Sequence, residues 1–166
     1  MQTTAGAPLP ELVPRRAGPG DAAEICVLQR CCWVAEAIEN DTLAIPALHE
    51  SVDDVREWVS RMHAWVVRRD GRLVGGVRAH LEDDRWEIGR LMVAPDLAGM
   101  GLGRRLLEFA EAQAPASATR FALFTGRRSE RNQRMYARAG YVPAEPPAGT
   151  LLQHIEIAVF MTKDRG

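Results

Sequence analysis

The stretch VAPDLAGMGLGRRLLEFAEA, residues 93–112, runs from the end of an apolar strand through three closely spaced glycines into a helical pattern. Glycine lowers the stability of a helix start relative to alanine, so Gly99, Gly101 and Gly103 indicate that something approaches the main chain closely. The unpaired N–H groups and the dipole of a helix N-terminus attract anions such as phosphate. The stretch therefore predicts either a phosphate-binding loop or a plain strand-to-helix turn that uses glycine for positive φ.

Two common nucleotide-binding loops do not fit this spacing. The dinucleotide fingerprint G-x-G-x-x-G needs glycine at its sixth position, where counting from Gly99 gives Arg104 and counting from Gly101 gives Leu106. No G-x-x-x-x-G-K-[ST] string occurs in the sequence. A shorter pyrophosphate cradle of main-chain amides remains, with Arg104 and Arg105 adding positive charge.

The longer stretch IGRLMVAPDLAGMGLGRRLLEFAE resembles the coenzyme A-binding motif of the GNAT family of N-acetyltransferases, which reads Arg/Gln-x-x-Gly-x-Gly/Ala after a strand ending in Val-x-Pro. Ala98 replaces the first motif residue, so one side-chain contact is missing while the amides remain. The resemblance implies acetyl-CoA as co-substrate, held between splayed strands 86–93 and 120–125. It implies cofactor-binding groups at Leu91, Met92, Val93, Gly99, Met100, Gly101, Leu102, Gly103 and Arg104. The strand carries a bulge in the family, and Gly89 is a position that fits one.

A length of 166 residues fits one domain, expected over 11–166 after a flexible segment 1–10. Strands are expected over 11–16, 64–68, 72–81, 86–93, 120–125, 141–144 and 154–162, and helices over 19–37, 51–62, 101–113 and 129–139. The resulting order is β-α-α-β-β-β-α-β-α-β-β, with residues 38–50 as a loop. Meander strands beside crossover helices predict an α/β protein with a mixed sheet. This order resembles the single-domain GNAT fold, whose sheet is mostly antiparallel.

A second stretch, SERNQRMYARAGY at 129–141, resembles a later family motif in which a helix ends at Tyr-x-x-x-Gly-Tyr/Phe. The matching residues are Tyr136, Gly140 and Tyr141. The resemblance implies that Tyr136 protonates the departing thiolate. Asn132 lies one helical turn earlier on the same face and is expected to bind the pantetheine arm, although many members carry asparagine where this chain has Ser129. The arginines of this segment are expected to form a solvated face, from which one or two meet the 3′-phosphate of coenzyme A: Arg127, Arg128, Arg131, Arg134 and Arg138.

Glu87 precedes the segment expected to pair with coenzyme A and occupies the position of a glutamate that acts as general base in some family members, often through water. The competing interpretation is a surface glutamate at a strand edge. Acidic residues near the first helix are expected to attract a cationic acceptor: Glu36, Glu39, Asp41 and Glu50. The acceptor is either a small-molecule amine or a protein amine.

Composition excludes other classes of partner. A net charge of −1 argues against a nucleic-acid-binding surface. No apolar run reaches the length of a membrane span and residues 1–10 do not resemble a signal peptide, so a cytoplasmic protein is expected. The cysteines Cys26, Cys31 and Cys32 lack metal-ligand spacing, so no metal is expected, and their place on the first helix separates them from the motif. Because dimers are frequent in the family, a homodimer is a candidate assembly.

These features together predict an acetyl-CoA-dependent N-acetyltransferase that moves an acetyl group from the thioester to a primary amine by direct attack. The alternative is a catalytically inactive acyl-CoA-binding sensor or interaction module of the same fold.

Overall fold

The computed structural model describes residues 13–166, so the predicted flexible segment 1–10 lies outside the described residues. The strands are β1 (Arg15–Arg16), β2 (His63–Arg69), β3 (Arg72–Glu82), β4 (Arg85–Val93), β5 (Arg120–Gly126), β6 (Val142–Pro143) and β7 (Ala158–Asp164). The helices are α1 (Ala22–Asn40), α2 (Pro46–His49), α3 (Val52–Arg61), α4 (Leu102–Ala112), α5 (Glu130–Arg138) and α6 (Leu152–Ile157), with 3-10 turns at Pro19–Asp21 and Pro95–Leu97. No helix in this part of the chain is long and apolar enough to cross a membrane.

Two short helices correct the predicted order of elements. Helix α2 forms inside the expected loop 38–50 because Pro46, with its fixed φ, suits the first position of a helix. Residues 154–157 belong to α6, and the last strand begins only at Ala158. The apolar run that contains both elements fits a short helix and a strand equally well, since periodicity does not separate them at this length.

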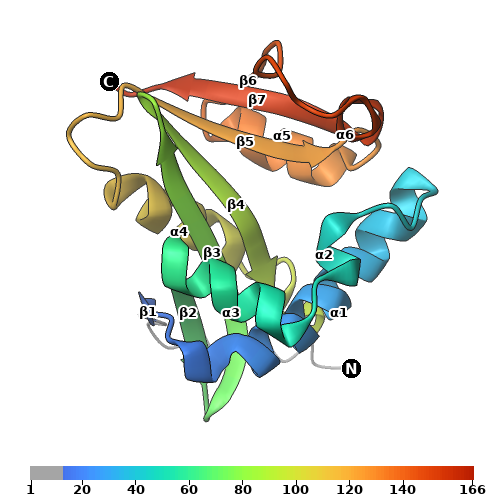
Figure 1. Cartoon of the computed structure of the whole chain (residues 1–166), viewed down its shortest axis with the longest axis vertical. Helices are drawn as coiled ribbons and strands as arrows, with labels where there is room; N and C mark the ends of the chain where they lie inside the picture. Colours follow the sequence, from blue (N-terminus) through green and yellow to red (C-terminus); the bar gives the residue numbers. More distant parts are fainter. Residues whose placement is uncertain (1–12) are drawn as a thin grey trace, which may run out of the picture.

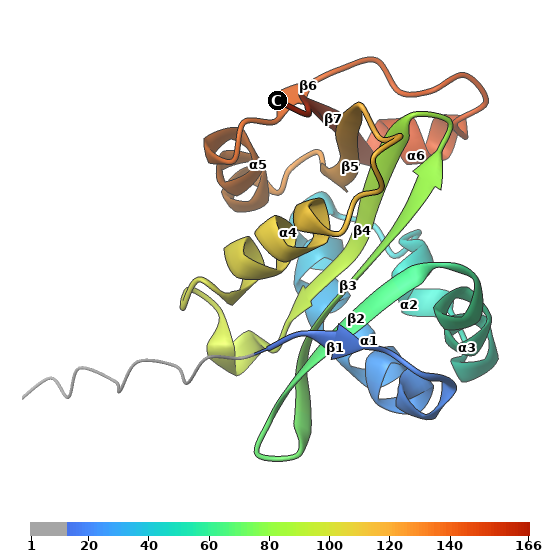
Figure 2. The same ribbon diagram turned by 90° about the vertical axis from the view of Figure 1, so that its left-hand side faces the viewer.

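The described strands form a seven-stranded sheet in the order β1-β2-β3-β4-β5-β7-β6. Its neighbouring strands are antiparallel except for the parallel pair β4 and β5. That pair joins only residues 85–87 to residues 120–122, and beyond them the two strands diverge (Figure 1). Helices α1, α2 and α3 cover one face of the sheet and α4 and α5 cover the other (Figure 2). The predicted mixed sheet with splayed central strands is confirmed.

A bulge bends β4 where it leaves β5. Gly76 on β3 lies opposite Met92, and Arg78 lies opposite Gly89, so β4 contains one more residue than β3 between these pairs. The sequence placed the bulge at Gly89, but the positive φ of 48° belongs to the next residue, Arg90. A non-glycine residue in this conformation stores backbone strain that the surrounding structure must hold.

Capping and packing fix the helices against the sheet. Helix α3 starts with a capping box, in which Ser51 Oγ accepts from the Asp54 amide at 3.1 Å and the Asp54 carboxylate accepts from the Ser51 amide at 2.7 Å. The buried indole of Trp86 on β4 donates to the carbonyl of Ala110 on α4 at 2.9 Å. This bond ties α4, and with it the glycine loop at its start, to the diverging strand.

Asp21 anchors the start of α1 to the sheet. Its carboxylate accepts hydrogen bonds from Arg15 at 2.8 and 3.0 Å, from Arg68 at 3.0 Å and from the amide of Gly18 at 2.9 Å. The Arg15 guanidinium, helped by the other donors, holds the pKa of this carboxyl well below its usual range. Folding therefore stabilises the charged form of Asp21.

Asp21→Asn is expected to lower the free energy of unfolding by about 1–3 kcal/mol at pH 7, because charge-assisted hydrogen bonds are lost. A carboxyl whose pKa falls on folding contributes its stability above its unfolded pKa, about 4, and loses it as the pH drops further. The deficit of the variant should therefore shrink below about pH 4 in urea unfolding. Exposed Asp53, paired with Arg56, provides the control, since Asp53→Asn should unfold like the wild type. A deficit that stays constant down to pH 2.5 contradicts this role of Asp21.

Candidate active site

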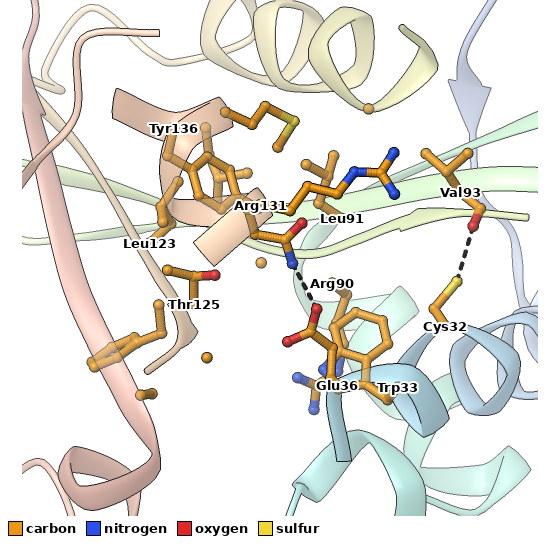
Figure 3. A pocket seen from close by; sticks show the side chains of 18 of the residues that line it. Cys32, Trp33, Glu36, Arg90, Leu91, Val93, Leu123, Thr125, Arg131 and Tyr136 are labelled. Atoms are coloured by element: carbon orange, nitrogen blue, oxygen red, sulfur yellow. Dashed lines mark hydrogen bonds between the residues drawn. The ribbon is translucent and has the colours of Figure 1, made fainter. Parts of the chain in front are cut away.

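A cavity of about 1150 Å³ lies between the diverging strands and continues to both faces of the sheet. Residues of β3, α4 and the glycine loop line it. Figure 3 shows the lining side chains that come from α1, β4, β5 and α5. The cavity brings together most of the predicted site residues: Glu87, Leu91, Val93, Gly99, Gly101, Leu102, Gly103, Arg104, Asn132 and Tyr136. The two others do not line it, since the Met92 side chain is buried in the core and that of Met100 is exposed.

The glycine loop presents unpaired amides at the N-terminus of α4. Gly99 and Gly101 have φ values of 82° and 84°, which disfavour any other residue. No described side chain caps the helix, and the amides of its first turn, residues 102–104, have no partner within the helix. A Cβ at Gly101 would meet no atom within 4 Å. A plain turn explains the positive φ values, but an uncapped helix end that lines a cavity is better explained by an anion.

Arg131 supplies positive charge at this loop. Its Nη2 atom lies 3.6 Å from the place where a Cβ on Gly99 would stand, and it makes no ion pair within residues 13–166. The sequence favoured Arg104 for this contact, but Arg104 Nε is bound to Glu108 at 2.8 Å. The sequence does not distinguish Arg131 from the neighbouring arginines, because the approach of α5 to the loop is a tertiary feature. Its position makes Arg131 the candidate for the side-chain contact that Ala98 removes.

Arg131→Ala is expected to raise the Kd for coenzyme A about 10-fold, because one charge-assisted hydrogen bond to phosphate is lost. Arg104→Ala is the matched control and should bind within about twofold of the wild type, since its guanidinium serves an exposed helix pair. Titration calorimetry measures both. An Arg104→Ala variant that loses as much affinity as Arg131→Ala contradicts the assignment.

A polar network joins α1 to α5 across the cavity, formed by Glu36, Asn40, Ser129 and Asn132. The Glu36 carboxylate accepts from Asn132 Nδ2 at 2.6 Å and from the hydroxyl of Ser129, to which Asn40 Nδ2 also donates at 3.1 Å. A Cβ on Gly126 would come within 2.5 Å of Asn40 Nδ2 and 2.9 Å of Glu36 Oε2, so the network requires glycine there. Asn132 keeps one N–H and its carbonyl oxygen for a ligand, and its role in binding coenzyme A stays a prediction.

Two of the acids expected to attract a cationic acceptor already have partners. Glu36 belongs to the network just described. Glu50 accepts from Arg90 at 2.6 Å and from Gln29 at 2.7 Å. These carboxylates therefore hold the walls of the site together. Sequence position alone showed their charge but not these partners.

Tyr136 combines burial with a hydroxyl that has no hydrogen-bond partner among the described residues. Its side chain lines the cavity, and its ring packs edge-on against Tyr141 with centroids 6.0 Å apart. Burial raises the pKa of the Tyr136 hydroxyl, and the nearby Glu36 carboxylate raises it further. The hydroxyl therefore remains protonated at neutral pH and is ready to donate to a ligand.

Two proton acceptors stand together near the point of divergence. Glu87 on β4 is paired with His80 on β3, and its Oε2 lies 3.5 Å from His80 Nε2. Its other oxygen accepts from Arg85 Nε at 2.9 Å. Both Glu87 and His80 line the cavity. His80 was missed from the sequence, although counting the hairpin register from Glu87 would have found it.

The cysteines lie closer to the site than the sequence predicted. Cys31 and Cys32 line the cavity, and Cys32 Sγ donates to the carbonyl of Val93 at 3.2 Å. Burial raises the pKa of the Cys32 thiol to about 11, so it stays protonated and serves as a hydrogen-bond donor rather than a nucleophile. Over residues 13–166, His, Cys, Asp and Glu form no cluster of three or more suited to a metal ion.

Comparison with known families gives a match over most of the chain. The model of the acetyltransferase (GNAT) family matches residues 24–141. Among curated proteins, the chain is 29% identical over 124 residues to UPF0157 protein YqkA of Bacillus subtilis (strain 168). The alignment covers 75% of this chain and 35% of that protein, so the chain spans about a third of this relative's length.

Solved structures share the fold at low sequence identity. The PaiA N-acetyltransferase of Thermoplasma acidophilum, solved with coenzyme A, superposes with a TM-score of 0.74 at 13% identity, covering 94% of this chain and 100% of that one. The N-acetylglutamate synthase of Neisseria gonorrhoeae, solved with coenzyme A and N-acetyl-glutamate, gives a TM-score of 0.70 at 21% identity, covering 93% of this chain and 35% of that one. The chain therefore shares its overall fold with these acetyltransferases at low sequence identity.

Proposed function

The chain belongs to the GNAT family of acetyltransferases. We propose that it transfers the acetyl group of acetyl-CoA to a primary amine by direct attack on the thioester. One observation carries the proposal. A single cavity joins an uncapped, glycine-rich helix start to the unpartnered hydroxyl of Tyr136 and to the paired acceptors Glu87 and His80.

The divergence of β4 and β5 provides the binding surface for the cofactor. Beyond Glu87, β4 pairs with no described strand on its β5 side, so the main-chain groups of residues 91–93 that face away from β3 are available to an extended ligand. The Val93 carbonyl, which accepts from Cys32, keeps a second lone pair. Adding an extended chain to an open strand edge is a general mode of recognition, and the pantetheine arm carries amides suited to it. The amides of residues 99–104, with Arg131, then hold the diphosphate.

Glu87, His80 and Tyr136 are the proposed proton acceptors and donor on the two sides of the thioester carbon. An amine is protonated at neutral pH and must lose a proton before it attacks. Glu87 or His80 accepts that proton, directly or through a water molecule. Tyr136 donates its proton to the thiolate that leaves as the new amide bond forms, and it regains a proton from the nitrogen of that amide, directly or through water. The transfer is then complete without a covalent enzyme intermediate.

The proposal is tested by measuring release of the coenzyme A thiol with a panel of amines, together with mass spectrometry of the products. Turnover above the rate without amine, with acetylated product, supports the transferase. The alternative, an acyl-CoA-binding module, rests on the Ala98 and Ser129 departures from the family motifs. Tight binding of acetyl-CoA without acetylation of any amine in a broad panel favours the module and contradicts the proposed function.

A further inference from the structure

One guanidinium group in the cavity, two residues from His80 on β3, has no anionic partner among the described residues. Arg78 on β3 lies opposite Gly89 on β4 and lines the cavity. Its guanidinium stands 4.8 Å from the centre of the Trp58 ring and makes no hydrogen bond or ion pair with any residue in 13–166. A Cβ on Gly89 would lie 3.8 Å from Arg78 Nε, so the absent side chain leaves the space above this arginine open.

The charges around Arg78 do not balance. The nearby Arg90 forms an ion pair with Glu50, in which its Nη2 atom lies 2.6 Å from Glu50 Oε1. The Arg90 Nε atom is buried without a hydrogen-bond partner, while Glu50 also accepts from the indole of Trp58 at 3.3 Å. The Glu50 carboxylate therefore faces the guanidinium groups of both Arg78 and Arg90, and one of the two positive charges is not neutralised.

Other titratable groups at this end do not cancel that charge. Burial lowers the pKa of His154, and Arg90 lowers it further, so His154 is neutral at pH 7. The Glu87 carboxylate is held by Arg85. Burial and repulsion from Arg90 lower the pKa of Arg78 to about 10, so Arg78 remains charged at neutral pH. A half-buried charge without a counter-ion is unfavourable, and an anionic ligand would offset that cost.

We propose that the acceptor carries a carboxylate close to its amine, as an amino acid does, and that Arg78 binds this carboxylate. The inference rests on the proposed function and names the class of acceptor for that site. Arg78 lies on the same face of β3 as His80, two residues away, which separates them by about 7 Å along the strand. A small amino acid spans that interval, with its amine toward Glu87 and His80. The planar guanidinium group suits a carboxylate because it donates two parallel hydrogen bonds.

Stacking on tryptophan does not by itself account for Arg78. Arg16 on β1 lies over Trp65 in a similar way, 5.5 Å from the ring centre, but it is not part of the cavity lining and is bonded to His63 at 3.0 Å. Arg16 therefore offers a matched control, since it is an arginine on a tryptophan ring away from the site.

The test compares amino acids with their own amides, which differ in charge and little in shape. The wild type is expected to acetylate at least one acid with a kcat/KM about 10-fold or more above that of its amide. Arg78→Met, which keeps an apolar cover on Trp58, should lower kcat/KM for the acid about 10- to 100-fold, mainly through KM. In Arg78→Met, kcat/KM for the amide and the KM for acetyl-CoA should be unaffected. Arg78→Lys should retain part of the preference for the acid over its amide. Arg16→Met should retain the whole of that preference.

A wild type that prefers amides, or an acid preference that survives in Arg78→Met, overturns the inference while leaving the transferase intact. If Arg78→Met does not fold, Arg78→Lys decides, because an undiminished preference in that variant argues against bidentate recognition. If no amine is acetylated although acetyl-CoA binds, the proposed function fails instead. Calorimetric titration of the twenty amino acids into the coenzyme A complex then decides the inference, since equal binding by wild type and Arg78→Lys contradicts it and weaker binding by the variant supports it.

Discussion

Tyr136→Phe is expected to lower kcat by about 100- to 1000-fold, because the change removes the proton donor for the leaving thiolate. The affinity for acetyl-CoA should stay within about twofold, since the phenylalanine ring still packs on Tyr141. The hydroxyl has no hydrogen-bond partner among the described residues, so its loss leaves no buried group unsatisfied. Thiol release gives kcat and calorimetry gives the Kd.

Tyr141→Phe is the matched control for this experiment. The Tyr141 hydroxyl donates to Glu111 at 2.8 Å, and Glu111 also accepts from Lys163 at 2.8 Å. Its removal should lower the melting temperature without reducing kcat more than about twofold, because the bond is structural. A Tyr136→Phe variant that turns over at the wild-type rate contradicts the assignment of Tyr136 as the acid.

Gly101→Asp is expected to raise the Kd for coenzyme A by about 100-fold or more. The new carboxylate would stand at the uncapped start of α4, where it competes for the same amides and repels the diphosphate. No described atom lies within 4 Å of the added Cβ, so the variant should still fold. Its only loss of stability should come from the strain of a positive φ at a non-glycine residue.

Gly71→Asp separates that strain from the loss of binding. Gly71 has a φ of 80° and equally open surroundings, but it lies in the turn between β2 and β3, away from the cavity. Both variants should lose similar stability in thermal unfolding, while only Gly101→Asp should lose affinity. Equal affinity of the two variants for coenzyme A shows that the glycine loop is a plain turn.

Local chemistry explains which parts of the molecule the sequence could predict. The capping box at Ser51 and the glycine loop depend on residues close together in the chain, so their patterns can be recognised in the sequence. The diverging strands and Tyr136 followed from a family resemblance over whole motifs. Helix α6 was missed because a short apolar run has no decisive periodicity.

Contacts between distant segments explain the rest. Glu36 and Asn132 meet across the cavity from α1 and α5, and nothing near Glu36 in the sequence indicates that partner. Cys32 reaches Val93 in the same way. The charge left on Arg78 emerges only after Glu50 is seen to bind Arg90. The acidic residues in the sequence suggested a cationic acceptor. In the structure, Arg78 and Arg90 share the single carboxylate of Glu50, which favours an acceptor that also carries an anionic group.

A crystal structure of the protein with bound coenzyme A tests the central claim most directly. We expect the pantetheine arm between β4 and β5 along residues 91–93, the diphosphate on the amides of residues 99–104 beside Arg131, and the sulfur within hydrogen-bond reach of the Tyr136 hydroxyl. Coenzyme A bound outside the diverging strands, or a sulfur that Tyr136 cannot reach, contradicts the account.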